Sequence, residues 1–169
     1  MKQGIVCEAK ESRIHQHPCT RRKPRAVRIE HSHGSSALAG KLLIDATNPL
    51  DASNGAPFMA IGHTDSAGET VQRALPSARV VKAFNTINCG LFVQPNFADG
   101  KPDMFIAGND AAAKQQVTEI LKSFGWRGAV DAGGIEKSRL LEPLAMLWID
   151  YGVTRNHWTH GFSLLNQKA

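Results

Sequence analysis

Short apolar runs alternate with helical patterns along most of this chain, and this alternation constrains its fold more than any other feature. Four runs have the length and composition of buried strands, namely residues 41–46, 79–84, 103–107 and 127–132. Segments with helical signals follow three of them. Strands that alternate with helices indicate the α/β class, in which right-handed crossovers join parallel strands. We therefore predict a doubly wound, mostly parallel sheet.

Three helices are predicted from capping residues and apolar periodicity. Residues 64–66 (TDS) offer N-caps for a helix that ends before Pro76. Residues 109–110 (ND) offer a cap for a second helix with one apolar face. The third helix, residues 135–151, is apolar nearly all round, and Pro143 predicts a kink in it.

The remaining segments are predicted as connections, apart from one short strand. Residues 51–63 are rich in Gly, Ala, Ser, Asn and Pro and are expected to form a loop. Residues 88–101 are expected to be irregular, and residues 162–165 are expected to add a short terminal strand. Asp45 stands inside an apolar strand, so its carboxylate should be hydrogen-bonded or lie near the strand end.

The basic charge of the chain belongs to its first 33 residues. These residues hold eight Lys or Arg and three acidic side chains, which already equals the net charge of +5 for the whole chain. Their pattern has neither a helix nor a strand period, so residues 1–35 are predicted to be a disordered basic tail. No aromatic residue is interleaved for base stacking, and the rest of the chain is neutral. We therefore expect no specific nucleic-acid partner.

Composition excludes several other classes of protein. No apolar run is long enough to span a membrane, and the N-terminus shows no apolar core of a secretory signal. Three cysteines without repeated spacing argue against a disulfide framework, and the Cys and His residues of residues 1–33 match no usual zinc-site spacing. These features predict a cytoplasmic chain with no membrane partner and no metal site.

The candidate binding residues follow two of the predicted strands. Residues 47–49 (TNP) come directly after the first strand, and Asn85 and Thr86 come after the second. Ligands of doubly wound sheets bind at the carboxyl ends of strands. An Asn amide offers both donors and an acceptor, which suits recognition of a carboxamide or a flavin-like ring edge. The alternative is that Asn and Pro at these positions only terminate the strands.

Other candidate sites are weaker. The turn at residues 108–110 (GND) opens a helix and could hold an anion, although its side chains are better suited to capping the helix themselves. No defensible Ser/His/Asp arrangement occurs, so we predict no catalytic acid or base. The apolar helix at residues 135–151 packs in the core or forms a subunit interface, and the sequence leaves both open.

Taken together and in order, six segments resemble the coenzyme F420-dependent NADP oxidoreductase family, which includes the cytosolic domains of STEAP metalloreductases. The resemblance covers about residues 36–169. The segments are GKLLIDATNPL (40–50), GHT (62–64), ARVVKAFNTI (78–87), MFIAGND (104–110), FGW (124–126) and VDAGGIEKSRLLEPLAMLWI (130–149).

The resemblance implies a Rossmann-like fold, NADP(H) as cofactor and hydride transfer to or from coenzyme F420 or a flavin. By the same resemblance, the nicotinamide end of the cofactor contacts Asn48 and Pro49. The turn of Ala83, Phe84, Asn85 and Thr86 borders the nicotinamide and the acceptor, with the last two facing the acceptor as substrate. Because the two segments leave adjacent strand ends in the family fold, they are expected to converge.

This sequence departs from the family pattern at its N-terminal side. Family members begin with a strand and a GxGxxG-type turn, and no GxGxxG occurs anywhere in this chain. Residues 1–35 match no part of the family, so residues 36–169 are interpreted as the C-terminal part of a truncated NADP-binding domain. The alternative to an oxidoreductase, impaired by truncation, is a noncatalytic remnant that self-associates into a homo-oligomer through residues 135–151.

Overall fold

A four-stranded sheet forms the centre of the domain. The computed structural model describes residues 34–167, and its main sheet has the strand order β1-β4-β5-β6. Its strands are β1 (Leu42–Asp45), β4 (Arg79–Lys82), β5 (Met104–Gly108) and β6 (Ala129–Asp131). Each strand lies within a predicted run or extends one residue beyond it.

Two of the three strand pairs are parallel, which agrees with the predicted mostly parallel sheet. β1 pairs with β4 and β5 pairs with β6 in parallel, whereas β4 and β5 are antiparallel. A parallel pair needs a crossover of about a dozen residues or more, usually through a helix. The connection from β4 to β5 contains only the short 3-10 helix η1 (Cys89–Leu91) in otherwise irregular chain. The chain therefore returns beside β4 in the opposite direction.

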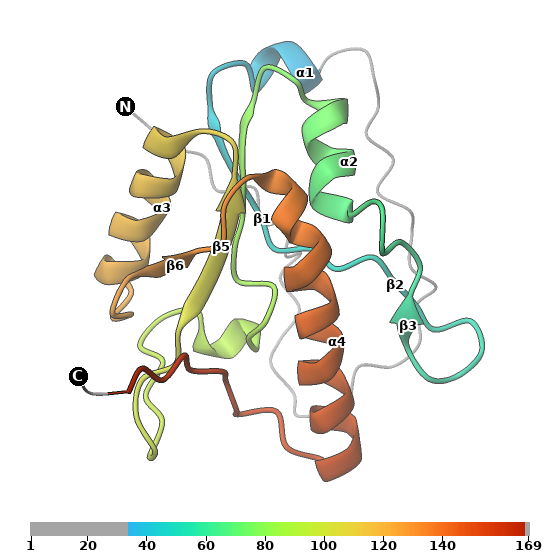
Figure 1. The fold of residues 1–169 in the computed structure, drawn as a ribbon, viewed down its shortest axis with the longest axis vertical. Helices are drawn as coiled ribbons and strands as arrows, with labels where there is room; N and C mark the ends of the chain where they lie inside the picture. Colours follow the sequence, from blue (N-terminus) through green and yellow to red (C-terminus); the bar gives the residue numbers. More distant parts are fainter. Residues whose placement is uncertain (1–33, 168–169) are drawn as a thin grey trace, which may run out of the picture.

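Helices cover both faces of this sheet (Figure 1). α3 (Ala111–Ser123) packs on one face, while α2 (Ala67–Ala74) and α4 (Ser138–Arg155) lie on the other. A four-residue helix, α1 (Gly34–Ala37), precedes β1, and a 3-10 turn, η2 (Ile135–Lys137), leads into α4. This three-layer arrangement is Rossmann-like. α4 runs as one element through Pro143 and ends four residues later than predicted.

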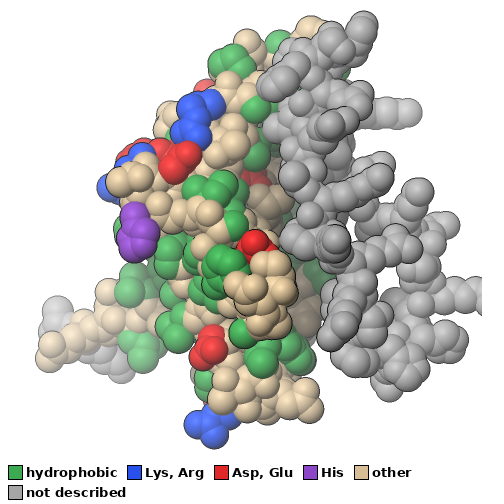
Figure 2. Space-filling model, turned by 90° about the vertical axis from the view of Figure 1, so that its right-hand side faces the viewer, with side chains coloured by type: hydrophobic (Ala, Val, Ile, Leu, Met, Phe, Trp, Pro, Cys, Tyr) green, Lys and Arg blue, Asp and Glu red, His purple; other side chains and the backbone are tan. Residues whose placement is uncertain are grey.

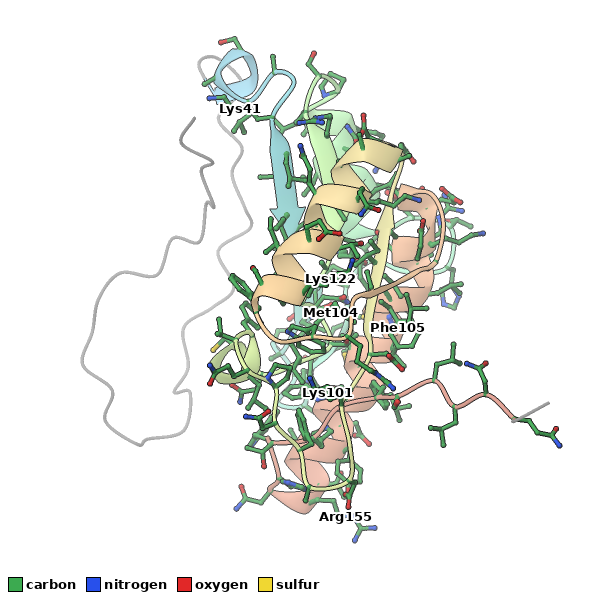
Figure 3. The ribbon with its side chains drawn as sticks, turned by 90° about the vertical axis from the view of Figure 1, so that its left-hand side faces the viewer. Lys41, Lys101, Met104, Phe105, Lys122 and Arg155 are labelled. Atoms are coloured by element: carbon green, nitrogen blue, oxygen red, sulfur yellow. The ribbon has the colours of Figure 1, made fainter. Side chains whose placement is uncertain are left out.

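The central strand β4 divides the core into two layers because its side chains alternate between the two faces. Val81 joins the cluster under α3, together with the fully buried Met104 at the start of β5 (Figure 3). Val80 joins the cluster under α2, and Lys82 points to the same side as Val80. A buried charge is therefore placed on the face that α2 and α4 cover.

Side-chain caps start the helices where the sequence predicts them. Ser66 caps α2 by accepting a hydrogen bond from the Glu69 amide, and Asp110 caps α3 by accepting from the Ala113 amide. Asn109, the alternative cap, instead accepts a 2.9 Å hydrogen bond from the Ile135 amide. Because the Asp110 carboxylate itself occupies the N-terminus of α3 and accepts from the Ala113 amide, the turn before α3 is not an open anion site.

Two sequence expectations about connections are wrong. Residues 51–63 are not entirely loop, because β2 (Leu50–Asp51) and β3 (Phe58–Met59) pair as a small antiparallel hairpin. Residues 162–165 form no strand; the Asp103 amide makes one backbone hydrogen bond to the Phe162 carbonyl, and no ladder follows. Both segments are too short for an alternating pattern to distinguish strand from turn.

Other expectations concern residues outside the described range. The predicted tail and its Cys and His residues lie there, except that α1 begins at Gly34.

Among the described helices, none combines the length and the apolar character that a membrane crossing requires.

Candidate functional site

The ends of β1 and β4 meet through a pair of asparagines. Asn48 Nδ2 donates a 2.9 Å hydrogen bond to the Asn85 carbonyl, and Asn85 Nδ2 donates a 3.0 Å bond to Asn48 Oδ1. The two residues are 37 positions apart in sequence. Since β1 and β4 are parallel neighbours, their carboxyl ends lie at the same edge of the sheet, so the expected convergence is confirmed.

Asn85 also hydrogen-bonds to α4. Its Nδ2 donates a second hydrogen bond, of 2.9 Å, to the Leu141 carbonyl. Its Oδ1 is buried, and no donor among residues 34–167 bonds to it. A buried acceptor without a partner is destabilising by about 1 to 3 kcal/mol, so it is a feature that requires an explanation.

The Phe84 side chain is part of the core, although the resemblance places the residue beside the cofactor. Ala83 and Phe84 are both buried, and the Phe84 ring lies 4.7 Å from Phe92 and 6.5 Å from Trp126, centroid to centroid. Phe84 has a φ of 63°, which is unusual for a bulky residue. Strained backbone of this kind is common where a strand end is shaped for a ligand. The contribution of Phe84 to a site is therefore the turn of its backbone.

Pro49 and Thr86 flank the asparagine pair. Pro49 is half-buried, and its carbonyl accepts a 2.7 Å hydrogen bond from the Ala60 amide. This bond links the segment after β1 to the β2–β3 hairpin. Thr86 is only 4% exposed. The six predicted residues therefore form two adjacent segments at one sheet edge, and Asn48 and Asn85 are the members whose side chains bond to one another.

A buried ion network lies directly below the asparagine pair. Lys82 Nζ is 2.7 Å from Asp45 Oδ2 and 2.7 Å from Glu142 Oε1, and all three side chains are at most 2% exposed. Lys82 Nζ also donates a 2.8 Å bond to the Thr47 carbonyl. The other Asp45 oxygen, Oδ1, accepts from the Thr47 amide and hydroxyl. The expectation that Asp45 is hydrogen-bonded is confirmed.

The carboxylate of Glu142, a residue of α4, lies at the N-terminus of α2. It accepts hydrogen bonds of 3.0 Å from the Ala67 and Gly68 amides, where free N–H groups and the helix dipole favour an anion. The helix approaches closely because Gly68 has no side chain: a Cβ there would overlap the Ser138 hydroxyl and come within 3.3 Å of Lys82 Cε. The internal carboxylate therefore fills the anion site that this helix end offers.

Sequence reasoning identified Asp45 but missed its partners. Lys82 and Glu142 each stand within an apolar run, RVVKAF and RLLEPLAM, as Asp45 stands within KLLIDA. Charges in such runs require pairing when the run is buried. The presence of three charges of mixed sign, each inside an apolar run, could have predicted a buried ion network.

Two further charged contacts lie near the N-terminus of α2. Arg139 on α4 donates a 2.8 Å hydrogen bond from Nε to Glu69 on α2, whereas Arg73, also on α2, donates bonds of 2.9 and 2.7 Å to Asp65, which precedes that helix. The hydrogen bond from Arg139 lowers the pKa of Glu69, and the bond from Arg73 lowers the pKa of Asp65. Both carboxylates therefore favour the charged form in the folded protein.

The chemistry available at the strand exits is recognition by amides. Asn48 is half-buried, while the Oδ1 of Asn85 lacks a donor within the described chain. No group of three Cys, His, Asp or Glu side chains in residues 34–167 is arranged to hold a metal ion. The arrangement suits binding and orienting a carboxamide-bearing ring, a task that requires shape and hydrogen bonds more than an acid or base.

Comparisons with known proteins relate the chain to one group of reductases. No family model matches it. It is 28% identical over 131 residues to the F420-dependent NADP reductase of Methanocaldococcus jannaschii, covering 76% of this chain and 58% of that protein. It is 32% identical over 112 residues to the metalloreductase STEAP3 of Rattus norvegicus, covering 65% of this chain and 21% of that protein.

A solved structure supports the same relationship. A crystal structure from Arthrobacter sp. FB24, which carries the name of an F420-dependent NADP reductase, superimposes with a TM-score of 0.75 at 41% sequence identity. The match covers 79% of this chain and 61% of that one. The chain therefore spans about three-fifths of the length of the F420-dependent NADP reductases that it matches, and about a fifth of STEAP3.

Proposed function

The chain is related in sequence and fold to the F420-dependent NADP reductases, as its motifs predicted, and from this relationship we propose an NADP(H)-dependent oxidoreductase function. In this proposal the strand exits bind the nicotinamide end of NADP(H) and border the ring of a deazaflavin of the F420 type or a flavin. Asn48, Pro49 and the backbone turn at Ala83 and Phe84 border the cofactor, while Asn85 and Thr86 lie where the nicotinamide and the acceptor meet.

The observation that carries the proposal is the Asn48–Asn85 pair with its unpartnered oxygen. A nicotinamide ring carries a carboxamide, whose N–H groups are the donors that Asn85 Oδ1 lacks among the described residues. The pair is held from two sides, by its own hydrogen bonds and by the Leu141 carbonyl. Fixed side chains of this kind orient a ring at little entropic cost.

The residues of this chain would act by positioning. When bound, the nicotinamide and the acceptor supply the hydride chemistry themselves, so the protein needs to hold two rings face to face. The buried Asn85 and Thr86 would exclude water from the reacting face. The φ of 63° at Phe84 turns the chain sharply after β4, which directs Asn85 toward Asn48.

The pyrophosphate end of the cofactor has no recognisable anchor in this sequence. Dinucleotides normally rest their phosphates on the glycine turn and helix N-terminus of a GxGxxG motif, which this chain does not contain. The N-terminus of α2 already holds the Glu142 carboxylate. We therefore propose that hydride transfer by this chain alone is impaired; the alternative is a noncatalytic remnant of such an enzyme.

Saturation-transfer NMR with millimolar NADPH tests the proposal on the chain as it exists. We expect stronger transfer to the nicotinamide protons than to the adenine protons. Asn85→Ala should reduce the nicotinamide signal, whereas the exposed Asn96→Ala should not. Equal transfer to both ends, or none, would contradict a nicotinamide subsite at the strand exits.

We also propose that α4 mediates self-association, because one of its faces is apolar and exposed. Leu140, Leu147 and Tyr151 follow one another at helical spacing and are 64%, 58% and 46% exposed. Figure 2 shows hydrophobic side chains gathered on this side of the domain. Exposed apolar stripes of this kind are typical of subunit interfaces.

Charges at the two ends of the stripe favour a second copy in antiparallel orientation. A two-fold axis between Ala145 and Met146 would set Leu140 of one copy opposite Tyr151 of the other. The same axis sets Glu136 opposite Arg155, a pair of opposite charge. Both side chains are exposed, and Arg155 points away from the domain at the end of α4 (Figure 3). A self-complementary patch is what a two-fold interface requires.

A cytoplasmic location is the final part of the proposal. Cys89, the cysteine within residues 34–167, is an exposed free thiol. Free thiols persist in reducing compartments, where disulfides are rare.

A further inference from the structure

Lys82 and Asn85 together form a hub between the two segments that meet β4 at its carboxyl end. Lys82 contacts the Thr47 carbonyl and the Glu142 carboxylate. Asn85, on the same segment, contacts Asn48 and the Leu141 carbonyl. These two contacts of Lys82 are thus each matched by a contact of Asn85 to the adjoining residue, whereas its third contact, with Asp45, has no counterpart.

The matched contacts close two rings of interactions. One ring runs through Thr47 and Asn48 at the end of β1, and the other runs through Leu141 and Glu142 in α4. Within each ring, one side is a charged contact of Lys82 and the other is an amide contact of Asn85. The position of the ammonium group therefore restricts where the amides can lie.

The contacts of Lys82 are more rigid than those of Asn85, because the buried ammonium group cannot exchange its protein partners for water. Lys82 is fully buried, and its partners Asp45 and Glu142 are at most 2% exposed. Breaking a buried ion pair leaves an uncompensated charge, so alternative positions of the ammonium are strongly disfavoured. The contacts of Asn85, in contrast, include one with the half-buried Asn48.

We propose that Lys82 is a positioning residue for the nicotinamide subsite: it fixes the Asn48–Asn85 amide pair by clamping the Thr47 carbonyl and the Glu142 carboxylate, without touching the ligand. The proposal rests on the proposed function for the ligand. The clamping itself is a property of the unliganded chain and is measured separately.

The first experiment records the side-chain NH₂ signals of Asn48 and Asn85 by ¹H–¹⁵N NMR without any ligand. Lys82→Met should shift and broaden both pairs of signals. Lys114→Met is the matched control, because it also removes a Lys–Asp pair, between Lys114 and Asp131 at 2.7 Å, but at the end of β6. If Lys82→Met moved the amide signals no more than Lys114→Met does, the clamp would be refuted.

Should Lys82→Met not fold, Lys82→Arg supplies the same comparison. Arginine keeps the positive charge between the carboxylates, but its planar fork cannot reproduce a compact ammonium on the Thr47 carbonyl. We expect a folded variant with displaced Asn48 and Asn85 signals. Amide signals that coincide with those of the wild type would overturn the proposal.

The second experiment measures saturation transfer from Lys82→Met, Asn85→Ala and the double variant to NADPH. If Lys82 acts through the amide pair, the loss of nicotinamide signal in the double variant should not exceed that of Asn85→Ala alone. Additive losses would contradict an action through Asn85. An absence of transfer in the wild type would count against the proposed function, and the ligand-free amide signals would still decide the clamp.

Discussion

Asn48 and Asn85 exchange two hydrogen bonds, of 2.9 and 3.0 Å, although 37 positions separate them in sequence. The contact joins the ends of two parallel strands, so it exists only because β1 and β4 are neighbours in the sheet. It also explains why neither side chain hydrogen-bonds to a turn of its own segment. The pair is the structural basis of the proposed subsite.

Removing either amide should slow hydride transfer in a fusion that supplies the missing glycine turn. The N-terminal half of an F420-dependent NADP reductase would be joined before Gly40. Asn48→Ala and Asn85→Ala should each lower NADPH-dependent reduction of a flavin or deazaflavin by up to ~100-fold, or about 2 to 3 kcal/mol. Asn96→Ala serves as the surface control. Unchanged turnover in both variants, with the fold intact, would remove these residues from the site.

The isolated chain should bind NADPH weakly. Without a glycine turn for the pyrophosphate, only contacts at the nicotinamide end remain, so we expect a Kd in the millimolar range, about −4 kcal/mol or less favourable. Isothermal titration calorimetry measures this directly. Micromolar binding would show that the chain holds another anion site.

Gly68→Ala should destabilise the domain. An added Cβ would overlap the Ser138 hydroxyl and press on Lys82 Cε. The helix α2 would then have to move away from the Glu142 carboxylate. Overpacking of this kind costs about 1 to 3 kcal/mol, although alanine has the better helix propensity. Chemical denaturation measures the difference. Gly62→Ala, where a Cβ meets nothing within 4 Å, should be close to neutral, and equal effects at both positions would contradict the packing argument.

The Glu69–Arg139 contact should stabilise the fold only above acidic pH. The pKa of Glu69 is lowered in the folded state from its ordinary value of 4.5, chiefly by the hydrogen bond from Arg139. The contribution is therefore complete above about pH 4.5 and is lost as the pH falls through the lowered pKa. In thermal melts, Glu69→Gln should lower Tm at pH 7 and converge with the wild type at low pH. The exposed Glu119→Gln is the control, and a pH-independent difference would argue for lost packing instead.

Self-association through α4 should depend on both the apolar stripe and its flanking charges. Leu147→Glu should convert dimers to monomers, because it places two carboxylates near the proposed two-fold axis. Arg155→Glu should weaken the dimer through repulsion from Glu136, and Glu136→Arg in addition should restore it. Analytical ultracentrifugation distinguishes these states. A wild-type chain that stays monomeric at high micromolar concentration would refute the interface.

The sequence alone determined the class of fold and the places where its elements begin. Buried strands have apolar runs, and helices have local caps such as Ser66 and Asp110, so both leave a signal within a few residues. The β2–β3 hairpin left no such signal because each strand is two residues long. The antiparallel return of β5 could have been inferred from the missing crossover helix, since pairing direction depends on the connection.

Tertiary structure alone decided how the candidate residues contact one another and what supports them. The resemblance predicted that the segments of Asn48 and Asn85 converge, but the hydrogen bonds between the two side chains depend on the exact placement of the strand ends, which the sequence does not specify. The local pattern marks Lys82 and Glu142 as charges that need partners when buried, but it does not specify that they pair with each other. Of the two partners of Lys82, Asp45 lies on the neighbouring strand and Glu142 lies on a helix far along the chain; folding brings the three charges together because none of them is stable when buried alone.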